Sequence, residues 1–250
     1  MNRGVYTIAS GGLAAQARLE AVAQNLANGN TVGYKAQRVA FDVRPLVNFP
    51  RPVVDRIAAE TVPQLVGIEQ TRDFSPGPLT TTGNPLDVAV TGRGFFAVAT
   101  AAGERYTRQG TFAVDAEGFL VTARGDRVRG DGGDLALGRG GGDVVIAGDG
   151  TVSVDGGRVG RLRVVDFGDE PALVGEGEAL FAAPPGTTGT PLEPADVELQ
   201  QGVLERANVD VVSGLVELID VARGYESYMK AIQRLDEVAK RSIEDVGRVG

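Results

Sequence analysis

The chain contains no cysteine, no histidine and no tryptophan. Without cysteine it can form no disulfide bond, and it offers no thiol nucleophile or thiolate metal ligand. Without histidine it lacks the commonest general base and the commonest transition-metal ligand of proteins. We therefore expect a protein that is not an enzyme, with no cofactor, no metal site and no catalytic residues.

Aromatic side chains and positive charge are also scarce. Aromatics make up 6% of the 250 residues, which leaves little to stack against a sugar, although a pair of catalytic carboxylates assembles only in space. The formal net charge is -8 and no basic cluster interrupts the sequence, so the electrostatic footprint of a nucleic-acid-binding protein is missing. No apolar run approaches the ~18–20 residues of a membrane span. We expect neither nucleic-acid binding nor membrane insertion.

The stretch from Ser10 to Lys35 has the clearest periodicity in the chain. Its apolar residues recur in steps of three and four, which predicts a helix with one narrow heptad stripe. Glycine and alanine occupy several positions of the stripe and favour close approach to another helix. The sequence Asn28-Gly29-Asn30 predicts the end of the helix, and Gly33 is a second breaker. The stripe comprises Val5, Ile8, Gly12, Ala15, Leu19, Val22 and Leu26.

A second heptad pattern lies at the other end of the chain. It begins after Asn208, a candidate N-cap, and is accompanied by acid-before-base pairs at i,i+4, such as Glu226 with Lys230. Gly214 and Gly224 interrupt this helix, at about 1 kcal/mol each relative to alanine. Its stripe comprises Val211, Leu215, Leu218, Ala222, Tyr225, Met229 and Ile232, and continues to Ala239 and Ile243.

The region between the helices differs in texture. Residues 36–70 carry four prolines and no clean period, which favours an extended linker with short strand pieces. From about residue 71 to residue 207, short apolar runs alternate with Gly- and Asp-containing turns, which indicates an antiparallel barrel- or sandwich-like domain. Hairpin turns are predicted at 115–118 and 148–150. The fold class is therefore α+β, with a central β domain on a coiled-coil stem of paired terminal helices.

Several short motifs are better explained as turns than as binding sites. Gly92-Arg93-Gly94 begins a dinucleotide-binding pattern, but alanine replaces its third glycine and a strand follows where a helix is required. The aspartates of the Gly-rich turns do not have the spacing of a calcium loop. The tripeptide Arg124-Gly125-Asp126 matches an adhesion motif but fits a hairpin turn.

Three blocks of the sequence resemble the bacterial flagellar rod and hook family of axial proteins. The N-terminal block contains Ser10-Gly11 and Asn25-Leu26-Ala27-Asn28, and ends in Gly33-Tyr34-Lys35. The middle block contains Gly94-Phe95-Phe96 and Tyr106-Thr107-Arg108. The C-terminal block contains Leu204-Glu205 and Asn208-Val209-Asp210. These blocks follow the family's order and span most of the chain, although Gln24 replaces an asparagine of the N-terminal pattern.

The resemblance implies a structural subunit of the flagellar basal-body rod. The length fits a rod protein better than the longer hook protein, with the proximal-rod type favoured over the distal-rod type. Implied partners are other copies of the chain, other rod proteins and the flagellar type III export apparatus. The implied location is the periplasm-spanning rod, reached without a cleaved signal peptide. Expected assembly contacts are Leu19, Val22, Asn25, Leu26, Asn28, Thr31, Gly33, Tyr34, Leu215, Leu218, Tyr225 and Ile232.

Two alternatives belong to other functional classes. A secreted β-rich adhesin or binding module on a helical stalk would have a self-contained coiled coil, and a carbohydrate-active enzyme would need a cleft with two carboxylates. For the rod subunit we expect a terminal helical assembly domain of residues 1–35 and 208–250, a linker of residues 36–70 and a central β domain of residues 71–207.

Overall fold

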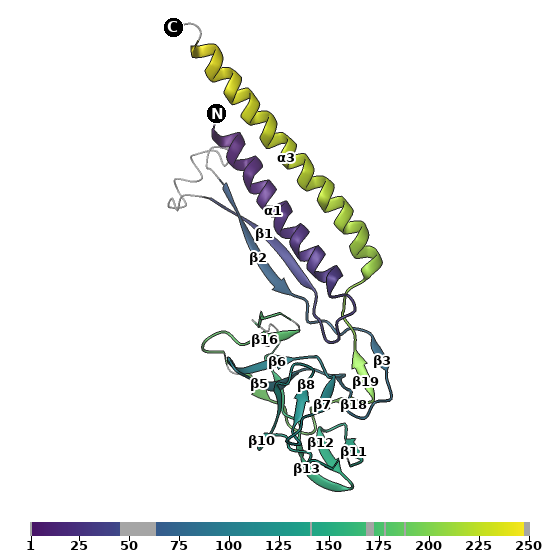
Figure 1. Cartoon of the computed structure of the whole chain (residues 1–250). Helices are drawn as coiled ribbons and strands as arrows, with labels where there is room; N and C mark the ends of the chain where they lie inside the picture. Colours follow the sequence, from purple (N-terminus) through teal and green to yellow (C-terminus); the bar gives the residue numbers. More distant parts are fainter. Residues whose placement is uncertain are drawn as a thin grey trace. The chain divides into compact units, whose positions relative to one another are not determined.

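The structure, a computed structural model, describes residues 2–45, 64–140, 142–168, 173–177, 179–187 and 189–247. In the sequence, helix α1 (Asn2–Ala27) precedes and helix α3 (Val211–Gly247) follows a β-rich region, so the chain is α+β as predicted. The two helices lie side by side (Figure 1). In the described part of the chain, no helix combines the length and apolarity needed to cross a membrane.

The chain divides into two compact units. The helical unit comprises residues 1–27, 36–73 and 210–250, and the β unit comprises residues 28–35 and 74–209. The chain therefore passes between the units at four points: 27/28, 35/36, 73/74 and 209/210.

The helical unit contains a β-ribbon as well as the two helices. Strands β1 (Gln37–Pro45) and β2 (Gln64–Arg72) pair antiparallel over nine residues each, from Gln37 opposite Arg72 to Pro45 opposite Gln64. The sequence predicted only short strand pieces within a linker here, and residues 46–63 of that linker lie outside the described residues. The ribbon follows from a period-two pattern, because Val39 and Phe41 alternate with Arg38 and Ala40.

The β unit contains many short strands, and every pairing among them is antiparallel, as predicted. The largest sheet follows the order β15-β16-β6-β5-β9-β8-β7, and β11-β12-β13 form a smaller one. Late strands close onto early ones, since β18 pairs with β4 and β19 with β3. The strands are β3 (Leu79–Thr81), β4 (Val88–Val90), β5 (Phe95–Thr100), β6 (Gly103–Thr107), β7 (Phe112–Val114), β8 (Leu120–Thr122), β9 (Arg127–Gly130), β10 (Gly133–Asp134), β11 (Val144–Ile146), β12 (Thr151–Val154), β13 (Gly157–Arg161), β14 (Val164–Asp166), β15 (Val174–Gly175), β16 (Leu180–Ala182), β17 (Thr190–Pro191), β18 (Leu199–Gln201) and β19 (Val203–Glu205).

Both predicted hairpin turns are confirmed. The turn at 115–118 joins β7 to β8, with Asp115 N–H donating to the Phe119 carbonyl and Gly118 at a φ of 92°. The turn at 148–150 joins β11 to β12. Residues 105–114 hold parts of two strands, β6 and β7, with a break between them, and residues 119–128 hold β8 and the start of β9 with a second break. The second break is a tight turn in which Gly125 has a φ of 87°.

The β unit has two apolar clusters. The larger cluster contains side chains with no exposed surface, including Phe96, Leu120 and Val152. The smaller cluster is aromatic, and Phe74, Phe95 and Phe181 meet edge to face with ring centroids 5.4–5.7 Å apart. The β unit therefore encloses a complete core.

Candidate functional site

Helices α1 and α3 approach each other closely where α1 has glycine. A Cβ atom added at Gly11 would lie 2.7 Å from Cε1 of Tyr228, and one at Gly12 would lie 3.8 Å from Cδ1 of Ile232. Toward the other end of α1, Leu26 lies next to Gly214. The start of α1 thus meets the later turns of α3, and the end of α1 meets its first turns, so the helices run antiparallel. The closest approach is at Gly11, which lies beside the predicted stripe, while Gly12 of the stripe makes an ordinary contact.

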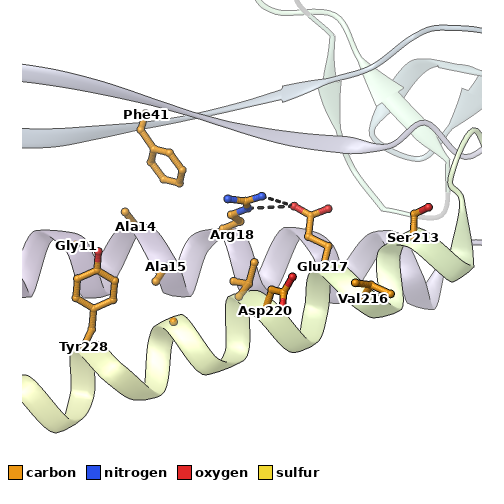
Figure 2. Close-up of a pocket in the computed structure, with 12 residues that line it drawn as sticks. Gly11, Ala14, Ala15, Arg18, Phe41, Ser213, Val216, Glu217, Asp220 and Tyr228 are labelled. Carbon is orange, nitrogen blue, oxygen red and sulfur yellow. Dashed lines mark hydrogen bonds and ion pairs between the residues drawn. The ribbon is translucent and has the colours of Figure 1, made fainter.

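A groove of about 600 Å³ is lined by both helices and by the ribbon. Figure 2 shows the Phe41 ring of β1 pointing toward α1, where Ala14 and Ala15 present only small side chains. Arg18 donates to Glu217 across the groove through Nη2 at 2.6 Å and Nε at 3.1 Å (Figure 2). Both side chains of this pair are about half exposed, so we expect it to contribute about 0–1 kcal/mol to folding.

The first turns of α3 carry an apolar stripe that this chain leaves uncovered. Val212 is 73% exposed, Leu215 47%, Val216 59% and Ile219 53%. Their spacing of three and four residues places them along one side of the helix. Val221, by contrast, is only 9% exposed. Helix α3 therefore has one apolar side buried within the unit and a second one in solvent.

Helix α3 begins with a cap at Asp210. Its carboxylate accepts hydrogen bonds from the backbone N–H groups of Val212 and Ser213 and from the Ser213 hydroxyl. These bonds, chiefly the one from the Ser213 hydroxyl, lower the pKa of Asp210 below its ordinary value. The prediction of Asn208 as the cap is wrong. Its amide instead donates to the backbone carbonyl and hydroxyl of Ser75.

Asn25 joins the end of α1 to the start of the ribbon. Its amide nitrogen donates to the Gln37 carbonyl at 2.8 Å, and its amide oxygen accepts from the Gln37 N–H at 2.7 Å. These two hydrogen bonds resemble the backbone pairing of two antiparallel strands. The sequence indicated Asn25 as an assembly contact, and the structure gives its side chain partners within the chain.

The turn after α1 belongs to the β unit. Asn28 accepts from the Thr31 N–H and hydroxyl, and Gly33 donates its N–H to the Glu205 carbonyl. Gly33 has a φ of 68°, and a Cβ atom there would lie 2.4 Å from the backbone of Arg108. Tyr34 is buried, and its carbonyl accepts from the Asn208 N–H. Helix α1 ends at Ala27, as predicted.

The predicted assembly residues thus fall into three sets in the single chain. Asn28, Thr31, Gly33 and Tyr34 gather in the β unit. Most of the helical residues are buried or half-buried, whereas Leu215 is exposed. Met229 and Val211, which the stripe also contained, are exposed as well, and the side chains of Val5, Ala239 and Ile243 lie outside the described residues. The half-buried helical residues are Leu19, Asn25, Leu26, Leu218, Tyr225 and Ile232, and Val22 is buried.

Sequence reasoning missed a buried group of charges. Lys35 and Glu205 are each 1% exposed, with Nζ and Oε1 at 2.8 Å, and Arg108 lies beside them. All three residues occur in the motifs that carry the family resemblance. Charged residues are almost never fully buried unless paired, but nothing in the sequence said which of many charges would be buried. In the described residues, no group of three or more His, Cys, Asp or Glu side chains could hold a metal ion.

Three protein-family models match the chain in the order that the sequence blocks suggested. Residues 6–35 match the flagella basal body rod protein model, residues 89–154 match the D1 domain of flagellar hook protein FlgE/F/G, and residues 200–244 match the C-terminal model of flagellar basal body rod FlgEFG proteins. The matches cover both helices and the middle of the β unit.

Full-length relatives give the same result. The chain is 34% identical to the flagellar basal-body rod protein FlgF of Caulobacter vibrioides, over 100% of both chains. It is 35% identical to FlgF of Escherichia coli and 33% identical to FlgG of Agrobacterium fabrum, with at least 95% of each chain covered. These matches give no support to the alternative of an adhesin on a helical stalk.

Proposed function

Because the chain belongs to the flagellar basal-body rod protein family, we propose that it is a structural subunit of the flagellar rod, the axial shaft needed for motility. Its role is assembly and not catalysis. Its partners are other copies of itself and other rod proteins, and its location is the flagellar basal body.

The uncovered apolar side of α3 is the observation that carries this proposal. The stripe formed by Val212, Leu215, Val216 and Ile219 lies in solvent in the single chain. Burying apolar surface contributes about 25 cal/mol per Å², so another helix that covered the stripe would stabilise the complex. The terminal helices of neighbouring copies are the proposed partners, packed as a coiled coil in head-to-tail, heterologous contacts that extend an axis.

The proposed assembly region comprises residues 1–35 and 208–250. Within it, residues 28–35 and 208–209 fold with the β unit. The central β domain of residues 71–207 forms the outer layer of the proposed rod. The predicted linker of residues 36–70 is corrected in its described part, because residues 37–45 and 64–72 pair as the ribbon of the helical unit. The interface residues proposed from the sequence remain the helical positions from Leu19 to Leu26 and from Leu215 to Ile232, together with the turn from Asn28 to Tyr34.

The route to the rod and the position within it are further parts of the proposal. We propose export through the flagellar type III apparatus, without a cleaved signal peptide, into the part of the rod that spans the periplasm. The absence of cysteine suits a chain that is threaded unfolded through a channel. The identity to FlgF over the whole of both chains supports the proximal-rod type, with the distal-rod type as its rival.

A single substitution at the helix end tests the assembly role. Leu26→Asp places a charge on the helical interface, and we expect it to abolish incorporation into rods while the β unit stays folded. The measurement is the amount of the variant in isolated basal bodies, together with the near-UV circular dichroism of the purified chain. Val145→Asp in β11 is the control, because it makes the same kind of change at an exposed site of the β unit. Normal rods containing Leu26→Asp would refute the proposal.

A further inference from the structure

A buried carboxylate of the β unit bonds to segments that lie, in the sequence, next to the points where the chain passes between the units. Glu205 accepts from Lys35 Nζ at 2.8 Å and from the Gly77 N–H at 2.7 Å, both at Oε1. Lys35 immediately precedes the crossing at 35/36, Gly77 follows the one at 73/74, and Glu205 precedes the one at 209/210. All of these contacts lie within the β unit.

The backbone around this carboxylate joins the same segments. The Glu205 carbonyl accepts from the Gly33 N–H, and the Tyr34 carbonyl accepts from the Asn208 N–H. The Ser75 carbonyl accepts from Lys35 Nζ and from the Asn208 amide. The segment 28–35, which lies between the crossings at 27/28 and 35/36, is therefore bonded to the β-unit segments next to the crossings at 73/74 and 209/210.

Arg108, which immediately follows β6, is the third charged residue of this cluster. Its Nη1 lies 3.6 Å from Glu205 Oε2 and donates to the Val90 carbonyl at 3.1 Å, and its guanidinium lies 5.1 Å from the centre of the Phe95 ring. Burial lowers the pKa of Arg108, and the Glu205 carboxylate and then the Asp166 carboxylate partly offset this. Glu205 therefore faces two cations in a buried site.

We propose that Lys35, Glu205 and Arg108 form a clasp, a charge cluster that holds together, as one cooperative element, the three β-unit segments next to the four crossings: 28–35, 74–78 and 203–208. Removing Glu205 would leave two buried cations uncompensated, and removing Lys35 would take from the buried Glu205 carboxylate its closest cation. The segments would then be released together and not one by one, while the apolar core around Phe96 would remain. Released segments would become longer and more flexible tethers between the units. Because a rod subunit must transmit load, the mechanical part of this inference rests on the proposed function.

Hydrogen exchange of the purified full-length chain, read by mass spectrometry, tests the clasp. In Lys35→Met we expect the segments 28–35, 74–78 and 203–208 to exchange at least tenfold faster, while β5 and β12 exchange as in the unmodified chain. Lys230→Met is the matched control, because Lys230 forms an exposed pair with Glu226 at 3.7 Å, and it should change none of these segments. An increase confined to residues next to position 35, or one spread evenly over the β unit, overturns the proposal.

A second variant covers the case in which Lys35→Met does not fold. Glu205→Gln keeps the size of the side chain and removes its charge, and we expect faster exchange in the same three segments, because Lys35 and Arg108 are left buried without their anion. Unchanged exchange of residues 28–35 in this variant also overturns the clasp. Swimming of a strain that carries either variant as its sole copy tests the mechanical role separately. Release of the segments together with normal swimming would reject that role, whereas loss of swimming with rods still assembled supports it.

Discussion

The β unit and the helical unit bury their apolar side chains to different degrees. In the β unit, Phe96, Leu120 and Val152 have no exposed surface. In the helical unit the buried apolar side chains are mostly small, such as Ala17 and Ala21. The helical unit also leaves a stripe of valine, leucine and isoleucine in solvent. The comparison shows a β unit with a fully buried core and a helical unit that leaves apolar surface exposed, as the proposed assembly with other chains requires.

The largest effect is expected in the β core. Phe96 is fully buried and meets Phe112 edge to face at 5.1 Å, so Phe96→Ala should lower the free energy of unfolding by about 3–5 kcal/mol. Chemical denaturation followed by near-UV circular dichroism measures this. Val145→Ala, at an exposed site of β11, is the control and should cost little. A loss as small as that of the control would mean that the core is loosely packed, and the contrast between the units would fail.

A smaller effect is expected at the turn that enters the β unit. Gly33 and Gly83 have similar φ values, 68° and 74°. A Cβ atom added at Gly33 would lie 2.4 Å from the Arg108 backbone, whereas one added at Gly83 would have nothing within 4 Å. Gly83→Ala should therefore lower the free energy of unfolding only by the strain of the left-handed conformation, about 1 kcal/mol. Gly33→Ala should lower it clearly more. Thermal unfolding of both variants measures the difference. Equal losses would show that the turn does not pack closely on the β unit.

Substitutions in the exposed stripe of α3 should affect incorporation into rods more than the stability of the single chain. Leu215→Ser changes a side chain that is 47% exposed, so the free energy of unfolding of the single chain should change by no more than about 0.5 kcal/mol. Incorporation into rods should nevertheless fall, because the stripe is the proposed contact with other copies. Denaturation and basal-body isolation measure the two effects. Arg223→Gln, an exposed polar change on the same helix, should affect neither. Strong destabilisation of the single chain by Leu215→Ser would mean that the helical unit is already complete.

The smallest effect concerns pH and the cap of α3. The folded-state pKa of Asp210 is lowered, first by the Ser213 hydroxyl and then by the backbone N–H groups of Ser213 and Val212. The cap therefore contributes its full stability above the unfolded pKa of about 4, and loses it as pH falls through the lower folded value. Far-UV circular dichroism from pH 6 to pH 2 should show fraying of α3 that is weaker in Asp210→Asn. If Asp210→Asn and the unmodified chain lost helix content over the same pH range and to the same extent, Asp210 would not be the group that makes the cap depend on pH.

Local signals predicted the fold well where one short stretch decides the structure. The end of α1 at Ala27 and the hairpin at 115–118 follow from capping and turn residues that lie beside each other in the sequence. The ribbon was predicted only as short strand pieces, because four prolines interrupt residues 36–70 and the alternation of Val39 and Phe41 is short. The start of α3 was misplaced by two residues, since both Asn208 and Asp210 are good caps and only the geometry selects one.

The buried charges could not be predicted in the same way. Lys35 and Glu205 are separated by 170 positions, and their pairing depends on β19 lying next to the turn after α1. No local rule identifies such a partner. The exposed side of α3 could not be predicted either. A heptad stripe does not indicate which of its residues contact the chain's own α1 and which remain exposed.

The pairing of the last strands with the first also has a consequence for the order of folding. Strands β3 and β4 obtain their partners only from β19 and β18, more than one hundred positions later in the chain. Such pairings have high contact order and form slowly. A chain delivered from its N-terminus onward cannot close the β unit until residues 199–205 have arrived. The topology itself therefore leaves β3 and β4 without their strand partners until most of the polypeptide has emerged.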